Sequence, residues 1–214
     1  AGLALHAVLL ALEVAGPLGR PGVRLGFGPV LSLTVCLVLV VHVIETQFIR
    51  LPAARRALAC AGGLAVLVEL TCPGEWRPAG SVWAPLHWLL GVGAYGLLGA
   101  AVVHALLLDA AELRLRPRPG QRPTGALDGG WTGGVPLLQL EHLTFVFVQA
   151  GFAVLTAAIV LGTLTTTQWR WDHKTVLSLL AWTVFAGLLA GRRFQGWRGQ
   201  RATRWLYAGA LLLM

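Results

Sequence analysis

The sequence predicts an all-α membrane protein, a polytopic bundle of about seven transmembrane helices. Hydrophobic residues make up 56% of the 214 residues and charged residues 12%, and the mean hydropathy is +0.70, which excludes an ordinary soluble domain. Apolar runs of about 16 to 28 residues recur along the chain, and lipid admits only helices or closed barrels. Because the runs lack the alternating pattern of barrel strands, we predict helices.

Seven apolar segments are predicted to form these helices. In chain order they cover residues 2–16, 29–48, 57–72, 84–108, 136–163, 174–191 and 205–214. Turn-forming residues separate most of them, at Gly16–Pro29, Pro52, Cys72–Gly74, Pro117–Pro123 and Gly196–Gly199. We therefore predict that residues 1–214 form one integral membrane domain. The chain starts at Ala1, and its last segment is too short to cross about 30 Å of hydrocarbon, so we expect the sequence to be trimmed at both ends.

Lysine and arginine residues are distributed unequally between the two sets of loops. Twelve fall in one set, which includes the predicted basic loops at residues 109–135 and 192–204, and five fall in the other. Positive charge is enriched in cytoplasmic loops, so we predict that the first set faces the cytoplasm in a multi-pass protein of the bacterial inner (plasma) membrane. The lipid bilayer is then the expected partner of the basic residues. Nucleic acid is not, because these residues form no basic domain.

A short loop with two tryptophans, Trp169–Lys174, lies between the fifth and sixth predicted helices, on the outer side. His87 and His173 lie at the outer ends of two predicted helices, so their imidazoles can meet there. Haem is the ligand that fits best, because it is flat and apolar, takes an imidazole on each side of its iron, and carries propionates that bind cations or indole N–H groups. We predict haem b with these two histidines as iron ligands. The other predicted contacts are Trp83, Trp169, Trp171 and Asp172, with Arg77, Arg170 and Lys174 for the propionates.

Three further histidines, His42, His104 and His142, are predicted to share an inner layer. His104 follows His87 by 17 residues, which is about 25 Å along a helix. This layer could be a second haem site, a proton path or three unrelated residues. Ionisable groups inside a membrane usually line a cavity or pathway.

Other functions remain open at this point. Tryptophans near helix ends also form interfacial belts without any ligand, so the alternative is a non-haem scaffold or accessory subunit of a larger membrane complex. A third hypothesis is a haem-bearing electron carrier that works with quinone. No hydrolase or nucleotide-binding motif is present, and we do not expect the protein to turn over a substrate.

Two stretches resemble the cytochrome c assembly protein family, which includes the haem-handling CcsA, CcmC and HemX-like membrane proteins. They are Trp169-Arg-Trp-Asp-His-Lys174 with the following Thr-Val-Leu-Ser-Leu-Leu-Ala-Trp182, and Gly196-Trp-Arg-Gly-Gln-Arg-Ala202. The second stretch and the His-Lys-Thr pattern are closest to the YpjD-like branch, and the resemblance covers residues 80–214. It implies haem binding at the outer tryptophan loop, for presentation to apocytochrome c or another membrane protein subunit, or for haem trafficking. Trp169, Trp171 and Asp172 match the family's Trp-Asp motif, and His87 matches its preceding histidine.

Overall fold

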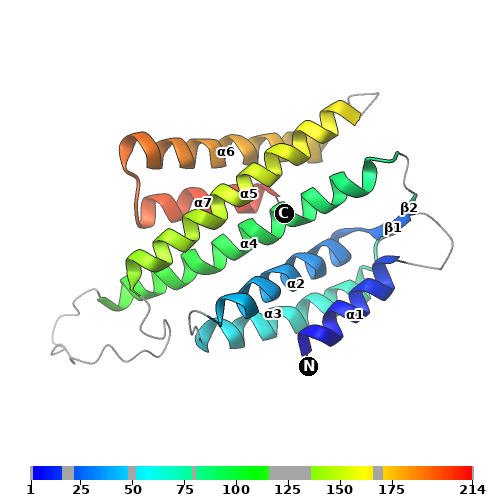
Figure 1. The fold of residues 1–214 in the computed structure, drawn as a ribbon, viewed down its shortest axis with the longest axis horizontal. Helices are drawn as coiled ribbons and strands as arrows, with labels where there is room; N and C mark the ends of the chain where they lie inside the picture. Colours follow the sequence, from blue (N-terminus) through cyan, green and yellow to red (C-terminus); the bar gives the residue numbers. More distant parts are fainter. Residues whose placement is uncertain are drawn as a thin grey trace.

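The computed structural model describes residues 2–15, 22–47, 52–78, 81–115, 136–165 and 171–213. In this part of the chain the backbone forms seven helices and two short strands (Figure 1). The helices are α1 (Gly2–Ala15), α2 (Phe27–Glu45), α3 (Pro52–Thr71), α4 (Ala84–Leu115), α5 (Leu137–Thr165), α6 (His173–Gln195) and α7 (Gln200–Leu213), and the strands are β1 (Gly22–Leu25) and β2 (Glu75–Pro78).

Four of the described helices, α2, α4, α5 and α6, are long and apolar enough to cross a membrane. This confirms an all-α, multi-pass membrane protein, but it does not reach the predicted count of about seven spans. Helices α1 and α7 have 14 residues each, about 21 Å at 1.5 Å per residue. Helix α3 has 20 residues but carries Arg55, Arg56 and Glu69.

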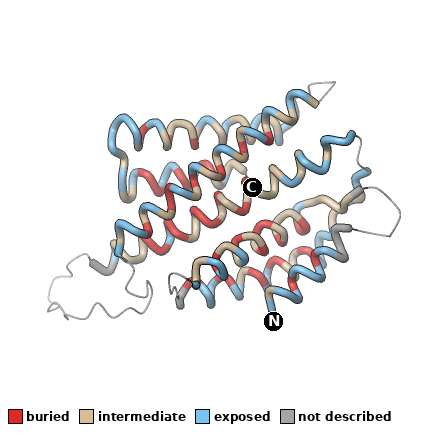
Figure 2. Tube along the Cα trace, in the orientation of Figure 1, coloured by how far each residue is buried: buried red, intermediate tan, exposed pale blue. Residues whose placement is uncertain are grey.

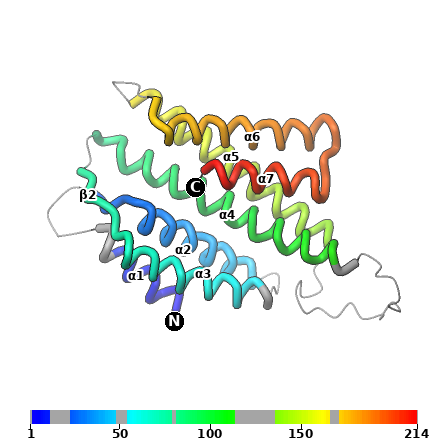
Figure 3. Tube along the Cα trace, turned by 180° about the vertical axis from the view of Figure 1, so that it is seen from behind, coloured from blue at the N-terminus to red at the C-terminus, as the bar shows by residue number. Residues whose placement is uncertain are grey.

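Helix α4 runs through the middle of the bundle. Figures 1 and 3 show α1, α2 and α3 on one side of it and α5, α6 and α7 on the other, and α4 packs directly against α2, α5 and α7. Small residues permit these contacts: a Cβ at Gly96 would lie 2.8 Å from Leu37 of α2, and one at Gly151 of α5 would lie 2.7 Å from Leu98. Two of the glycine positions along α4 and α5 thus serve helix packing.

Most of the buried apolar side chains form two clusters, and α4 and α5 contribute to both. One cluster joins α4, α5, α6 and α7 around Leu98, Phe185 and Leu206, and the other joins α2, α3, α4 and α5 around Leu58 and Leu140. Figure 2 shows that buried residues lie where helices face each other, while outward surfaces are exposed. Many of the exposed side chains are apolar, such as Leu70 and Leu164, which suits a surface in contact with lipid.

The bundle has two chemically different ends. At the "sheet end", β1 and β2 pair antiparallel next to the start of α2, and the starts of α4 and α6 and the end of α5 lie toward the same end of the bundle (Figure 1). At the opposite "arginine end", α2, α4 and α6 finish and α3, α5 and α7 begin. This end carries Arg55, Arg56, Arg192, Arg193 and Arg198.

The sheet was not predicted from the sequence. Each strand has only four residues, too few for an alternating pattern to stand out. Glycine makes the pairing possible: Gly74 has a φ of +74°, and a Cβ at Gly26 would lie 2.6 Å from the Gly74 Cα. The two strands hold the start of α2 against the end of α3.

Two segments predicted as loops are partly helical. Helix α4 continues to Leu115, so the segment predicted as loop at 109–135 begins with helix, and residues 116–135 lie outside the described residues. The segment 192–204 contains the end of α6, a turn and the start of α7. The reason is tertiary contact: Asp109 of α4 accepts hydrogen bonds from Thr203 and Tyr207 of α7, at 3.1 and 2.8 Å. These contacts extend the helices beyond the apolar runs.

Candidate functional site

His87, near the start of α4 at the sheet end, is oriented by a hydrogen bond to α5. Its half-buried ring lies against α5, with Nδ1 3.1 Å from the backbone carbonyl oxygen of Ala158. A carbonyl oxygen can only accept, so Nδ1 carries the hydrogen and donates it. In the neutral imidazole, Nε2 then keeps the lone pair that binds a metal. A second-shell carbonyl of this kind commonly orients histidine ligands in metal sites.

Glycine creates the space around this ring. A Cβ at Gly162 of α5 would lie 3.0 Å from Cε1 of His87, so the ring rests against bare backbone. One turn along the same face of α4, a Cβ at Gly91 would meet nothing within 4 Å. Among the described residues, no atom thus packs within 4 Å of that position on the turn that follows His87.

Asp172 caps the N-terminus of α6. Its Oδ1 accepts hydrogen bonds from the backbone N–H and the hydroxyl of Thr175, at 2.9 and 2.7 Å. The Thr175 N–H and then the hydroxyl lower the pKa of the Asp172 carboxyl below its ordinary value. A capping role accounts for the aspartate of the tryptophan loop. The sequence signal for it, Asp followed three residues later by Thr before an apolar run, was present.

The other predicted residues of the outer site that the structure describes are exposed. His173 and Lys174 occupy the first positions of α6, and Trp171 and Trp83 are 71% and 55% exposed. His173 and His87 lie at the same end of the bundle, on two helices that both pack against α5. Trp169 and Arg170 lie outside the described residues.

At the arginine end the structure brings two of the three inner histidines together. His42 and His104 are buried and line one cavity with Glu45, whose Oε1 lies 3.1 Å from Nε2 of His104. His142 is instead exposed on α5. Sequence reasoning missed Glu45, although His42 and Glu45 have the three-residue spacing that places two side chains on one helix face.

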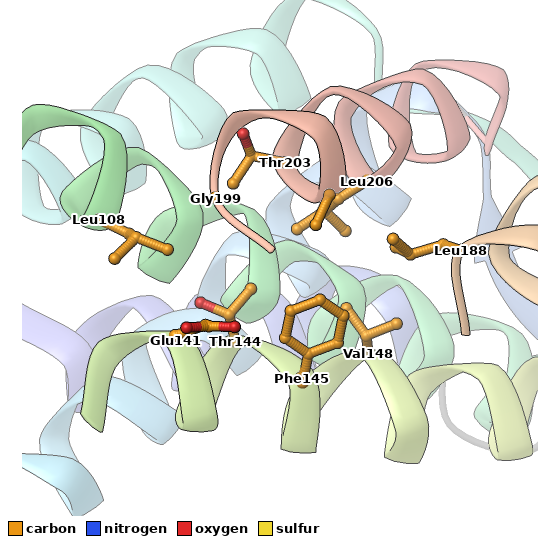
Figure 4. Close-up of a pocket in the computed structure, with 10 residues that line it drawn as sticks. Leu108, Glu141, Thr144, Phe145, Val148, Leu188, Gly199, Thr203 and Leu206 are labelled. Atoms are coloured by element: carbon orange, nitrogen blue, oxygen red, sulfur yellow. The ribbon is translucent and has the colours of Figure 1, made fainter. Parts of the chain in front are cut away.

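Two small cavities near the arginine end are too small for haem. The first lies between α2, α3 and α4 beside His42 and His104. The second lies between α4, α5, α6 and α7 and is lined by Glu141, Thr144, Thr203 and apolar residues (Figure 4). Each holds about 10 Å³, room for one water molecule, whereas ligand pockets measure about 300–1,000 Å³.

An ion pair joins α5 and α6 at the arginine end. Arg192 of α6 donates to Glu141 Oε1 at 3.0 Å, and its guanidinium carbon lies 3.4 Å from the ring centre of Phe145. Glu141 adjoins His142 in sequence but is paired with another helix. Within the described ranges, no three His, Cys, Asp or Glu side chains form a group that could hold a metal ion.

Comparisons with known proteins match this membrane bundle to one family. Residues 27–214 match the family described as "Cytochrome C assembly protein". The cytochrome c biogenesis protein CcsA of Synechococcus sp. (strain RCC307) is 28% identical over 153 residues, covering 63% of this chain and 49% of the relative. CcsA of Heterosigma akashiwo (strain NIES-293 / 8280G21-1) is 34% identical over 71 residues, covering 31% and 22%.

A third relative, from Azospirillum brasilense, is called "Uncharacterized 28.8 kDa protein in nifR3-like 5'region". It is 33% identical over 140 residues, covering 63% of this chain and 49% of the relative. This chain thus spans about half the length, or less, of the relatives that it matches. No solved structure matches it. Placement in the YpjD-like branch stays a prediction, but a match over residues 27–214 shows that the chain belongs to the cytochrome c assembly protein family.

Proposed function

We propose that this protein binds haem b at its sheet end and acts in haem handling or cytochrome c biogenesis. The observation that carries the proposal is the position of His87. The Ala158 carbonyl fixes the tautomer of its ring, glycine clears the space around it, and Nε2 is left as the ligating atom. The name of the CcsA relatives, cytochrome c biogenesis proteins, supports the same role.

His87 and His173 are the proposed axial ligands. When bound, haem supplies a redox-active iron that takes nitrogen ligands from above and below. His87 holds its ligating nitrogen in place from α4. His173, exposed at the first turn of α6, would supply the second nitrogen, and the Asp172 cap fixes where that turn begins.

The surrounding side chains would bind the rest of the porphyrin. The indoles of Trp83, Trp169 and Trp171 would cover its apolar faces or donate to its propionates. Arg77, Arg170 and Lys174 would pair with the propionate charges. Residues of this set come from two connections at the sheet end, so haem would tie them together.

The membrane arrangement follows from the charge distribution. We place the arginine end in the cytoplasm of a bacterium and the sheet end outside its inner membrane. In this arrangement all seven helices cross, with α1, α3 and α7 as shorter or more polar spans beside the four apolar ones. The protein passes haem to a partner, such as apocytochrome c or another membrane subunit, and does not turn over a substrate.

The second candidate is a non-haem scaffold within a larger membrane complex. The exposure of Trp83 and Trp171 at helix ends favours it, because tryptophans in such places anchor helices at the interface without a ligand. Under this alternative His87 is a packing residue, and the hydrogen bond to Ala158 only joins α4 to α5.

Optical spectroscopy separates the two candidates. Purified protein should show a Soret band, and a double variant with His87→Ala and His173→Ala should lose it. His142→Ala is the matched control, because His142 is an exposed histidine at the opposite end. A double variant that keeps the full Soret band would show that His87 and His173 do not hold the haem. A colourless wild-type protein that stays colourless when haem is added would favour the scaffold.

A further inference from the structure

The arginine end contains a closed cluster of ionisable groups that the proposed haem site does not use. His42 and Glu45 come from the last turns of α2, and His104 comes from the half of α4 nearer the arginine end. His42 and His104 are 5% and 2% exposed, and the Glu45 side chain is 11% exposed. All three line the same cavity of about 10 Å³.

The hydrogen atoms of His104 can be assigned from its contacts. Nδ1 lies 2.8 Å from the carbonyl oxygen of Ala100, one turn earlier on α4, so Nδ1 carries a hydrogen and donates it. In a neutral ring, Nε2 would then present a lone pair. Its neighbour at 3.1 Å is Oε1 of Glu45, and a lone pair facing an ionised carboxylate oxygen at that distance is repulsive. The pair is stable only when one additional proton resides on His104 or on Glu45.

The remaining polar atoms face the same space. Neither His104 Nε2 nor Glu45 Oε1 has a hydrogen-bond partner among the described residues, and His42 Nε2 likewise has none there. Buried polar atoms without partners are rare and need an explanation. The cavity between them has room for one water molecule, which can accept one hydrogen bond and donate others.

The groups packed around the cluster are apolar, aromatic or positively charged, or are already hydrogen-bonded. Helix α3 contributes the apolar Leu58 and, from its exposed first turn, the positive charge of Arg55, which acts on His42. Helix α5 places the Phe147 ring 5.2 Å from the His104 ring. Asp109, the next acid on α4, is occupied by Thr203 and Tyr207. Glu45 is therefore the carboxylate that lies with the two imidazoles. Burying a carboxylate without a proton or a cation costs free energy.

We propose that His42, Glu45 and His104 form a proton-binding site that holds one proton between Glu45 and His104 and one water molecule beside His42. The proton comes from water at the arginine end, where Glu45 ends α2, and returns to it. No bond other than those to the proton changes. The site is distinct from the proposed haem site, which lies at the other end of α4.

Magnetic resonance on the full chain in lipid measures the proton directly. With nitrogen-15 in histidine and carbon-13 in glutamate, the wild-type protein near neutral pH should carry a proton either on His104 Nε2 or on the Glu45 carboxyl. In Glu45→Gln, which keeps the shape of the side chain, His104 should become neutral with an unprotonated Nε2. Glu75→Gln, an exposed change on β2, should leave His104 as in the wild type.

Two outcomes would overturn the proposal. One is a wild-type protein in which His104 Nε2 and Glu45 are both unprotonated near neutral pH. The other is a double variant, His42→Gln with His104→Gln, that loses part of the bound haem, because the cluster would then be a second haem site. Failure of the sheet-end haem site would leave the resonance result unchanged, so the two proposals fail separately.

Discussion

The two ends of α4 use histidine in opposite ways. At the sheet end, one nitrogen of His87 is fixed by the Ala158 carbonyl, and a Cβ at Gly91, one turn further along, would meet no described residue within 4 Å. At the arginine end, one nitrogen of His104 is fixed by the Ala100 carbonyl, but the other faces Glu45 inside a cavity of about 10 Å³. The same first hydrogen bond therefore leads to different chemistry.

Under the two proposals, the second nitrogen decides the role of each histidine. A carbonyl acceptor on Nδ1 sets the tautomer in both places and leaves Nε2 as the reactive atom. At the sheet end, we propose that Nε2 of His87 takes the haem iron. At the arginine end, where Nε2 meets a buried carboxylate, it takes a proton.

The largest expected effect separates the ends by haem affinity. His87→Ala should weaken haem binding by about 100-fold or more, because loss of a ligand exceeds the 10–100-fold effect of losing a second-shell partner. His104→Ala should leave haem affinity unchanged. Haem titration followed by absorbance checks both variants, and equal losses in the two would erase the distinction between the ends.

The next effect concerns stability at the arginine end. Glu45→Ala leaves two buried imidazoles without their carboxylate partner, and we expect the free energy of unfolding to fall by about 1–3 kcal/mol. Glu75→Ala, an exposed change on β2, should have little effect. Thermal unfolding in one detergent measures both, and an unchanged Tm for Glu45→Ala would mean that the cluster contributes no stability.

A smaller effect tests the support of the His87 ring. In Gly162→Ala the new Cβ lies 3.0 Å from Cε1 of the ring, so the ring must shift and its hydrogen bond to Ala158 weakens. We expect about a tenfold loss of haem affinity, the size of a second-shell effect. Gly63→Ala on α3 is the control, because a Cβ there meets nothing within 4 Å. Equal affinities in the two variants would show that the ring needs no support from α5.

The smallest effect concerns the start of α6 and its pH dependence. The Thr175 N–H and hydroxyl lower the pKa of Asp172 below its ordinary value of 3.8. The stability from this cap is therefore present above that ordinary value and is lost as the pH falls through the lowered pKa. Circular dichroism of wild type and Asp172→Asn across acidic pH tests this, since asparagine keeps a cap that does not titrate. Identical acid profiles for the wild type and Asp172→Asn would show that titration of Asp172 does not affect the stability of α6.

Hydropathy predicted the positions of all seven helices and placed His87 and His173 at one end. It could not predict where helices stop, because that depends on contacts between helices, such as Asp109 with Thr203 and Tyr207. Of the predicted spans, α2, α4, α5 and α6 are long and apolar enough to cross a membrane. The other three helices differ in length or charge: α1 and α7 have 14 residues each, and α3 carries Arg55, Arg56 and Glu69.

The candidate sites were only partly visible in the sequence. Depth along a helix placed His42, His104 and His142 in one layer, but depth says nothing about direction around the axis. The structure turns His142 outward and adds Glu45 to the cavity that His42 and His104 line. The role of the Ala158 carbonyl was not visible, because the sequence does not show which backbone group of α5 faces His87.

Chemical rescue of a cavity variant tests the central claim, that His87 is an axial ligand of haem at the sheet end. Ferric wild-type protein loaded with haem should give the low-spin electron paramagnetic resonance signal of two histidine ligands. In His87→Gly this signal should disappear, and added imidazole, which can occupy the vacated space against Gly162, should restore it. A low-spin signal that persists unchanged in His87→Gly without imidazole would contradict the assignment.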